Sequence, residues 1–480
     1  MMKTINRLVL VLLFSIRIFL SNAHELVDYV NPMIGATTLD NIGNTDLGLG
    51  KTFPGVCTPF GLVQLSPDTK TGGDNGSGYS YHHTTIEGFS FTHMSGIGWY
   101  GDLGNFLVMP TTGKLHTFKG TEENPDEGYR SRFSHETESA HIDKYEVKLD
   151  DYDIKVELTA APRSGMIRFT YPEHEESRIQ IDLARRIGGT STEQFVEVVD
   201  NHIIRGWMKC TPENGGWGNG AGQANYTIYF YCLFSRPLVD FGIWSADIPE
   251  GISRKNDDEN YYQYVRNAVI HPQAKVMEGK HLGFYTQFPT RKDEQVLMKC
   301  GISFVSIEGA QKNLEHDIPD WDFNKVSVCT RKMWNDALSK IKIEGNESDK
   351  TTFYTALYHT MIDPRCFSDI DGKYIGADNK VYQTSTFTYR TIFSGWDVFR
   401  SQFPLQTIIN PDLVNDEINS LIQIAEKSGK GYYPRWEFLN AYSGCMVGNP
   451  AVSVLTDAYQ KGIQNYPVDK SIQHRTDIWQ

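Results

Sequence analysis

Apolar and polar residues alternate along much of the first 310 residues of the chain. The clearest stretch runs from Tyr145 to Ala160, where two alternating runs are joined by Asp150-Asp151. A period of two puts every second side chain on one face, so this stretch predicts a β-hairpin with one buried face. The same pattern predicts strands at Met166–Tyr171, Ile179–Leu183, His202–Lys209, Tyr226–Phe234, Tyr262–Ile270 and Val296–Ile307. Many short strands favour a β-sandwich, which we expect over residues 24–310.

Beyond Asn313 the apolar residues recur every three or four positions, which predicts helices. We expect helices at Thr330–Ile343, at Lys350–Ile362, after Asn410-Pro411 as far as Gly429, after Asn449-Pro450 as far as Gly462, and from Val468 onwards. Proline suits the first position of a helix because the N–H it lacks would have no partner there. Helices of this length joined by loops are the units of a helical bundle or toroid. The chain is therefore predicted to be a β + α multidomain protein.

The N-terminus has the pattern of an export signal. Lys3 and Arg7 precede the apolar run Leu8–Ile16, and the small residues Ser21 and Ala23 form a cleavage site before residue 24. The alternative is a membrane anchor, but a span needs about 20 apolar residues and position 17 is an arginine. We expect residues 1–23 to be a signal peptide and the protein to be exported, to the periplasm or the extracellular space, without stable membrane insertion.

Charge and cysteine content exclude several other classes. The formal net charge is −13, and an acidic surface repels phosphate backbones, so nucleic acid is not an expected partner. The 7 cysteines are widely spaced without a CxxC pair, so we expect no disulfide framework, while a single pairing stays open. His82, His83 and His93 lack a second ligand set at zinc spacing and are more typical of hydrogen-bonding histidines. The oligomeric state is not determined by these features.

Three blocks of the chain carry recognisable motifs. The first block holds Val27–Gly35, Pro54-Gly55 and Pro59–Asp68; the second holds Ile86–Gly96, Gly98-Trp99 and Asp102; the third holds Ser394–Arg400, Pro434–Glu437 and Cys445–Ala451. Together these blocks resemble glycoside hydrolase family 92, the calcium-dependent exo-α-mannosidases. Each block alone is moderately specific, whereas their order and spacing over most of the chain carry the resemblance.

The resemblance implies an N-terminal β-sandwich (residues 24–310), a helical linker (residues 311–345) and an (α/α)6 toroid that starts at residue 346. It also implies hydrolysis of terminal α-mannosides with inversion, with mannose-rich N-glycans or mannans as substrates and α-1,2 bonds as the expected linkage. Ca²⁺ would bind the sugar hydroxyls. One carboxylic acid would protonate the leaving oxygen, and a second carboxylate would activate water about 6.5–9.5 Å away.

The family places its general acid beside a Gly-Asn-Ala-Trp-like stretch and its general base in a Gly-Asn-Asp-Asp-like stretch. Neither stretch occurs before Gln480, so we carry over no acid, base or metal ligand and expect the toroid to be incomplete. We therefore expect this chain alone to release no mannose and to be poorly soluble. Two alternatives are a non-catalytic carbohydrate-binding fragment and a glycoprotein amidase that uses Cys445.

The second block supplies two candidate sugar contacts in a glycine-rich loop. Trp99 either stacks on a mannose ring or fills the interface between the domains. Asp102 either accepts hydrogen bonds from sugar hydroxyls or satisfies amides of its own loop. The resemblance favours sugar contact for Trp99 and leaves both interpretations of Asp102 open.

The third block supplies five further candidates for substrate binding, of which Trp396 and Asp397 precede a predicted helix. Asp397 either accepts two sugar hydroxyls or caps the helix, and the resemblance favours the sugar. Arg400 lies three residues further along and either pairs with Asp397 or contacts the sugar, and the pairing is favoured. Trp436 is expected to bind the substrate. Glu437 either lines the pocket or forms a structural ion pair with Arg435 or another base, and both interpretations stay open.

Overall fold

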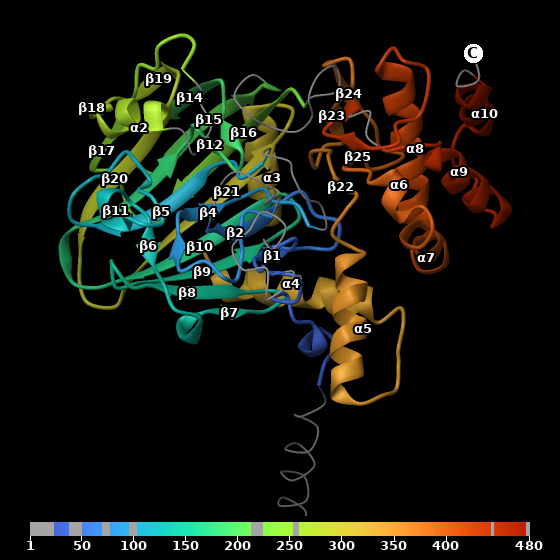
Figure 1. Ribbon diagram of the computed structural model, residues 1–480, viewed down its shortest axis with the longest axis horizontal. Helices are drawn as coiled ribbons and strands as arrows, with labels where there is room; N and C mark the ends of the chain where they lie inside the picture. The colour runs from blue at the N-terminus through green and yellow to red at the C-terminus, as the bar shows by residue number, and fades with distance from the viewer. Residues whose placement is uncertain are drawn as a thin grey trace, which may run out of the picture.

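The computed structural model describes residues 24–37, 50–69, 77–95, 103–212, 224–252, 259–442 and 446–476. Strands fill one half of the molecule and helices fill the other (Figure 1). The helices α4 and α5 lie below the junction between the halves (Figure 1). This arrangement confirms a strand-rich N-terminal part followed by a helical C-terminal part. The predicted signal peptide, residues 1–23, lies outside the described residues.

Two large antiparallel sheets form the sandwich. The first has the order β1 (Val56–Cys57), β2 (Gln64–Asp68), β4 (Gly88–Ser90), β5 (Leu107–Thr112), β11 (His174–Asp182), β20 (Leu282–Thr290), β17 (Asp240–Ser245) and β18 (Val269–Pro272). The second has the order β19 (Val276–Gly279), β14 (Glu193–Val198), β15 (Ile203–Cys210), β16 (Tyr226–Phe234), β21 (Glu294–Ser303), β10 (Ser164–Tyr171), β9 (Ile154–Ala160), β8 (Tyr145–Leu149) and β7 (Ser139–Ala140).

Short two-stranded sheets lie in both halves of the molecule. They are β3 (Thr85–Ile86) with β6 (Ser131–Arg132), β12 (Arg185–Arg186) with β13 (Gly189–Thr190), β22 (Arg365–Cys366) with β25 (Arg390–Thr391), β23 (Lys373–Ile375) with β24 (Val381–Gln383), and β26 (Glu437–Phe438) with β27 (Ala441–Tyr442). The last three pairs sit among the helices, where the apolar spacing did not predict strands. The β22–β25 and β26–β27 pairs flank the pocket described below.

The predicted hairpin is present as β8 and β9. Tyr145 pairs with Leu158, and Leu149 pairs with Ile154, so the turn lies between residues 149 and 154. The side chains of Tyr145, Leu149 and Leu158 are completely buried between the sheets. One face of this alternating segment therefore contributes to the sandwich core, as the period of two predicts.

The strand predicted at Tyr262–Ile270 is wrong. Residues 259–266 form the helix α2 (Glu259–Arg266), and the strand β18 begins only at Val269. Tyr261, Tyr262 and Val265 are buried together in a small apolar cluster. Their spacing of three and four residues is helical, and it outweighs the apparent alternation of tyrosines in this segment.

The sandwich carries one disulfide among the described residues, between Cys232 and Cys300. These two cysteines stand opposite each other on the neighbouring strands β16 and β21. The sequence predicted no disulfide framework and left a single pairing open, and the described residues contain one pairing.

The remaining helices follow the sandwich in the chain. They are α3 (Ile307–Asp317), α4 (Phe323–Leu338), α5 (Glu347–His359), α6 (Gly395–Val398), α7 (Gln402–Ile409), α8 (Pro411–Lys427), α9 (Pro450–Gln460) and α10 (Val468–Thr476). Helix α4 starts earlier than the apolar spacing predicts, because Asp322 caps it by accepting a hydrogen bond from the amide of Lys325. No helix in the described ranges is long and apolar enough to span a bilayer.

A buried aspartate ties the two halves together. Asp369, which follows β22, accepts hydrogen bonds from Ser303 at the end of β21 and from Asn313 on α3, at 2.8 Å each. Burial raises the pKa of the Asp369 carboxyl to about 6, against the lowering effect of those two donors. The helix α3 itself packs against β16 and β21. The junction is therefore built from specific polar contacts as well as apolar packing.

Candidate functional site

A pocket of about 170 Å³ lies at the junction between the two halves. Among the described residues, the sandwich half contributes one wall residue, and the helical half contributes the end of α5, the turn before β22, the chain after β25, the short helix α6 and the start of α7. The lining residues are Ser95, His359, Ile362, Asp363, Pro364, Ile392, Ser394, Asp397, Val398 and Gln402. Among the sequence candidates that the structure describes, Asp397 is the one that lines this pocket.

Asp397 is held in place through a single carboxylate oxygen. The hydroxyl of Ser394 donates to its Oδ2 at 2.5 Å, and the indole N–H of Trp436 donates to the same atom at 2.8 Å. The side chain of Trp436 is 1% exposed, so its indole orients the carboxylate from below the pocket surface. Asp397 is itself exposed, and no described residue donates to its Oδ1. This oxygen is available to a ligand hydroxyl.

Arg400 does not form the predicted ion pair with Asp397. Helix α6 ends at Val398, so Arg400 lies beyond it and does not share a helical face with the aspartate. The guanidinium stacks over the rings of Trp396 and Phe399 instead, at 4.9 and 4.3 Å from the ring centres. It also donates to the carbonyl oxygen of Trp396 at 2.7 Å. The partly buried Trp396 and the exposed Arg400 thus form a stacked pair next to the pocket.

Glu437 is completely buried and lies outside the pocket lining. It accepts hydrogen bonds from the hydroxyl of Thr391 and from the amide N–H groups of Ile392, Phe393 and Asn440. Burial raises the pKa of the carboxyl to about 7, despite these donors. The side chain therefore joins the chain after β25 to the β26–β27 hairpin. Neither Arg435 nor another base pairs with it in the described contacts.

Five polar residues of the described lining were not among the sequence candidates: Ser95, His359, Asp363, Ser394 and Gln402. Gln402 donates to the carbonyl oxygens of residues 360 and 363, at 2.8 and 2.6 Å, which fixes the turn after α5. The available sequence signal is a histidine at the end of a predicted helix, followed by Asp363-Pro364. This pattern predicts the end of a helix. It does not predict that His359 and Asp363 line a pocket, because that depends on how the helix packs in the fold.

Arg365 connects the pocket to the sandwich. Its guanidinium donates to both carboxylate oxygens of Asp363, at 2.7 and 3.0 Å, and to the backbone oxygen of His93 at 2.7 Å. It also donates to the side-chain oxygen of Gln64 on β2. Because Arg365 is only 2% exposed, these contacts join the pocket wall to the sandwich interior.

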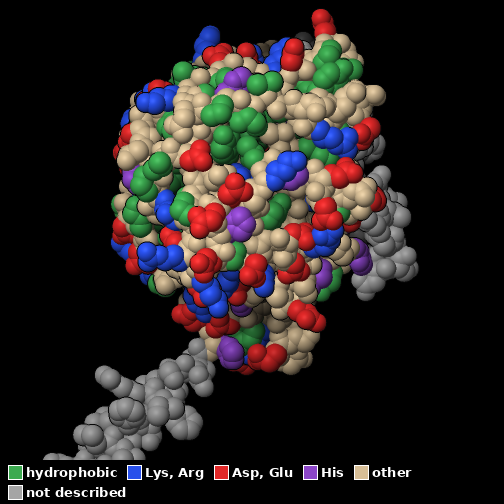
Figure 2. All heavy atoms as spheres, turned by 90° about the vertical axis from the view of Figure 1, so that its left-hand side faces the viewer, with side chains coloured by type: hydrophobic (Ala, Val, Ile, Leu, Met, Phe, Trp, Pro, Cys, Tyr) green, Lys and Arg blue, Asp and Glu red, His purple; other side chains and the backbone are tan. Residues whose placement is uncertain are grey.

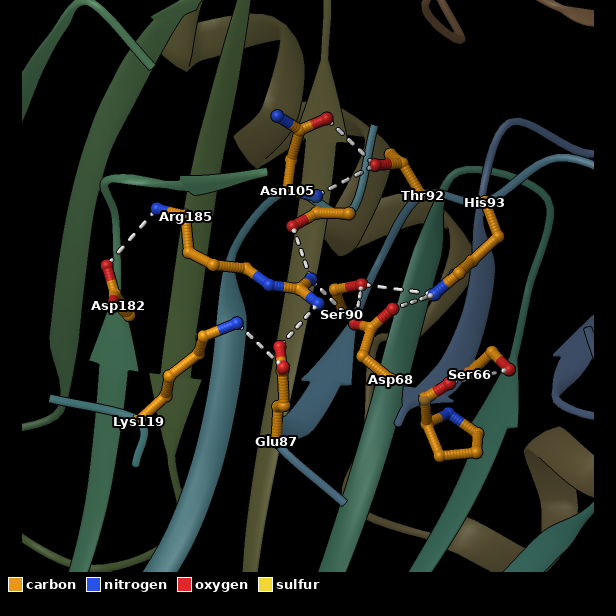
Figure 3. A network of polar contacts seen from close by, with 12 residues as sticks. Ser66, Asp68, Glu87, Ser90, Thr92, His93, Asn105, Lys119, Asp182 and Arg185 are labelled. Atoms are coloured by element: carbon orange, nitrogen blue, oxygen red, sulfur yellow. Dashed lines mark hydrogen bonds and ion pairs between the residues drawn. The ribbon is translucent and has the colours of Figure 1, made fainter. Parts of the chain in front are cut away.

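Behind His93 lies a buried network of charged side chains (Figure 3). The Nε2 atom of His93 is 3.0 Å from Oδ1 of Asp68, and the hydroxyl of Ser90 donates to Oδ2 of Asp68 at 2.5 Å. Arg185 bridges Asp68 and Glu87 with one N–H to each carboxylate, both at 3.0 Å. The exposed fraction of the Asp68 and Glu87 side chains is 0%, so water does not screen these charges.

Glu87 sits among three cations. Burial alone would raise the pKa of its carboxyl, but Lys119, Arg130 and Arg185 outweigh burial and lower that pKa to about 2. The network fixes β2, β4 and the chain that leads to the end of the sandwich at Ser95. His93, one of the histidines considered in the sequence, is accordingly a hydrogen-bonding residue of this network.

Trp99, Asp102 and Cys445 lie outside the described residues. Their expected roles stay predictions. Within the described ranges, no group of three or more His, Cys, Asp and Glu side chains lies together in a way that could hold a metal ion. The described residues therefore offer no cluster of these side chains for the calcium ion that the family resemblance implies.

The protein is built as a β-sandwich followed by helices, with a pocket that holds two carboxylates at their junction. Comparison with known sequences identifies the family. Residues 29–303 match the glycosyl hydrolase family 92 N-terminal domain, and residues 309–476 match the glycosyl hydrolase family 92 catalytic domain. The chain belongs to glycoside hydrolase family 92.

Solved structures of this family are similar to the chain. The family GH92 α-mannosidase BT3965 from Bacteroides thetaiotaomicron is 33% identical, with a TM-score of 0.83 over 95% of this chain and 57% of that one. The inverting mannosidase BT2199 from the same organism is 26% identical, with a TM-score of 0.75 over 94% of this chain and 55% of that one.

A curated relative from Arthroderma benhamiae, described as an uncharacterized secreted glycosidase, is 23% identical over 376 residues. The match covers 74% of this chain and 44% of the relative. The chain therefore spans about half the length of the relatives it matches.

Proposed function

We propose that this chain is the sugar-holding part of an inverting exo-α-mannosidase that acts on mannose-rich N-glycans or mannans. The main support for this proposal is the geometry of Asp397. Two donors fix its carboxylate through Oδ2, and Oδ1 stays available in the pocket. A carboxylate held in this way accepts hydroxyl hydrogen bonds strongly and without reorganisation. One similar solved structure is a family GH92 α-mannosidase in complex with mannoimidazole, which supports a mannoside ligand.

The chain's share of the reaction is binding and orientation. Trp436 sets the direction of the Asp397 carboxylate, and Ser394 holds the same oxygen from the start of α6. We assign neither the general acid nor the general base to a residue of this chain. Glu437 is not a candidate, because it is buried and its oxygens are used by Thr391 and backbone amides. Calcium dependence and an α-1,2 preference belong to the proposal through the family alone.

The proposed location is outside the cytoplasm. The basic and apolar N-terminus supports it, as does the relative that is described as secreted. Figure 2 shows acidic and basic side chains interspersed over the outer end of the sandwich. Such a mixed and net acidic surface does not favour a nucleic-acid partner.

Calorimetric titration of the purified chain with methyl α-mannoside tests the proposal. We expect binding in the millimolar to micromolar range and a loss of affinity of at least about tenfold in Asp397→Asn, because a charged acceptor becomes a neutral one. Asp412→Asn, on the exposed first turn of α8, is the matched control. Unchanged affinity in Asp397→Asn would remove the basis of the proposal.

An activity assay separates binding from turnover. We expect the chain to bind the sugar and to release no mannose from α-1,2-mannobiose. Robust release would mean that an acid and a base lie among these 480 residues, and the assignment of a binding role alone would then be wrong.

A further inference from the structure

Two buried polar atoms in the pocket lack a hydrogen-bond partner among the described residues. They are Nε2 of His359, at the end of α5, and the hydroxyl oxygen of Ser95, at the end of the sandwich segment. Both residues line the pocket that holds Asp397. A buried polar group without a partner is unfavourable, so native proteins rarely keep two of them at one site. A ligand that fills the pocket would supply the missing partners.

The chemistry of the two atoms indicates what that ligand carries. Burial lowers the pKa of the His359 imidazole to about 4, so the ring is neutral near pH 7. A neutral imidazole nitrogen donates or accepts depending on its tautomer, and a serine hydroxyl does both. A ligand hydroxyl also does both, so it complements either state of the histidine. A carboxylate or phosphate could only accept.

The charges around the pocket also favour a neutral ligand. Its described lining includes the carboxylates of Asp363 and Asp397 but no lysine or arginine. Arg365 compensates Asp363 from behind, with both of its contacts to that side chain at 3.0 Å or less. The charge of Asp397 is left facing the ligand, and it would repel an anionic substituent placed next to it.

We infer that Ser95 and His359 form a second hydroxyl-binding pair in the Asp397 pocket, which selects a neutral sugar over phosphorylated or carboxylated ones. The inference rests on the proposed function and adds two specificity-determining residues to it. The pair comes from both halves of the molecule, one residue from each. The bound sugar therefore bridges the junction between sandwich and helices.

Titration with methyl α-mannoside and its 2-, 3-, 4- and 6-deoxy analogues tests this pair. We expect His359→Phe to weaken binding of the parent sugar about three- to tenfold, the usual effect of one neutral hydrogen bond. The analogue that lacks the hydroxyl facing His359 should bind the wild type and the variant equally. His359→Gln, which restores a donor and an acceptor, should recover part of the affinity. His316→Phe, at an exposed histidine on α3, is the matched control.

Three results would contradict the inference. Equal binding of every sugar by wild type and His359→Phe would mean that the two atoms serve bound water only. An equal loss for every analogue would mean a structural role. Tighter binding of mannose 6-phosphate than of mannose would reject the preference for a neutral sugar.

If His359→Phe does not fold, Ser95→Ala provides the same comparison. Wild type that binds no sugar overturns the proposed function itself, whereas a loss in Asp397→Asn with none in His359→Phe overturns this inference alone.

Discussion

Glu417 provides a sharp test of the electrostatics of the helical half. Its side chain on α8 is completely buried, and neither carboxylate oxygen has a hydrogen-bond partner in the part of the chain that the structure describes. Burial raises the pKa of the carboxyl from 4.5 to about 8, with Arg390 opposing and Asp416 adding to the shift. Arg390 is already committed to Asp416, to which it donates at 3.1 Å. The native state therefore holds Glu417 protonated at neutral pH.

The sign of the pH dependence follows from the two pKa values. Below pH 4.5 the carboxyl is protonated in both the folded and the unfolded chain, so it adds no pH dependence. Between pH 4.5 and about 8 only the folded chain binds the proton, and the free energy of unfolding falls as the pH rises. At about 1.4 kcal/mol per pH unit, the loss between pH 5 and pH 7 is about 2.5 kcal/mol. Above about pH 8 the penalty is complete.

Glu417→Gln removes this titration and keeps the shape of the side chain. We expect the stability of the variant relative to wild type to rise by about 2.5 kcal/mol between pH 5 and pH 7. Native-state hydrogen exchange of the α8 amides measures the stability of this half separately from that of the sandwich. Asp412→Asn, an exposed carboxylate on the same helix, is the control. A difference between Glu417→Gln and wild type that stays constant with pH would refute the reasoning.

Two further predictions concern residues behind the pocket and within the sandwich. Trp436→Phe keeps an aromatic ring but removes the N–H that holds Asp397, so we expect methyl α-mannoside affinity to fall about three- to tenfold, as measured by calorimetry. Unchanged affinity would show that Ser394 alone orients the carboxylate. Glu87→Gln leaves Lys119, Arg130 and Arg185 without their central charge, and we expect a loss of about 3–5 kcal/mol in urea unfolding. Glu193→Gln, at an exposed pair with Lys209, should change stability by less than about 1 kcal/mol, and equal effects of the two substitutions would contradict the assignment.

The spacing of apolar residues correctly predicted the elements that pack against the core with one face. The β8–β9 hairpin and the proline-initiated helices α8 and α9 are present, because one face of each meets the core over its whole length. Segment 262–270 was misassigned because Tyr262 and Tyr264 alternate while the buried set is Tyr261, Tyr262 and Val265. Alternation over so few residues does not separate a strand from a short helix.

The pocket was predictable only in part. The block around Asp397 identified the carboxylate, but the length of α6 decided that Arg400 stacks on Trp396 instead of pairing with the acid. Ser95 and His359 lie 264 positions apart in the sequence and share a pocket only through the contact of the two halves. Glu417 occupies the apolar face of α8, where a pattern of apolar residues gives no sign that a carboxyl is buried among them.

Arg365 limits how this molecule can be recombined with its relatives. A hybrid that takes its sandwich from one family member and its helices from another inherits the guanidinium from the helical parent and Gln64 from the sandwich parent. The guanidinium is hidden from solvent, so a mismatched sandwich leaves donors without acceptors at the place where the pocket wall is anchored. The two positions should therefore be exchanged together, and shuffling experiments that separate them should give folded halves that fail to dock.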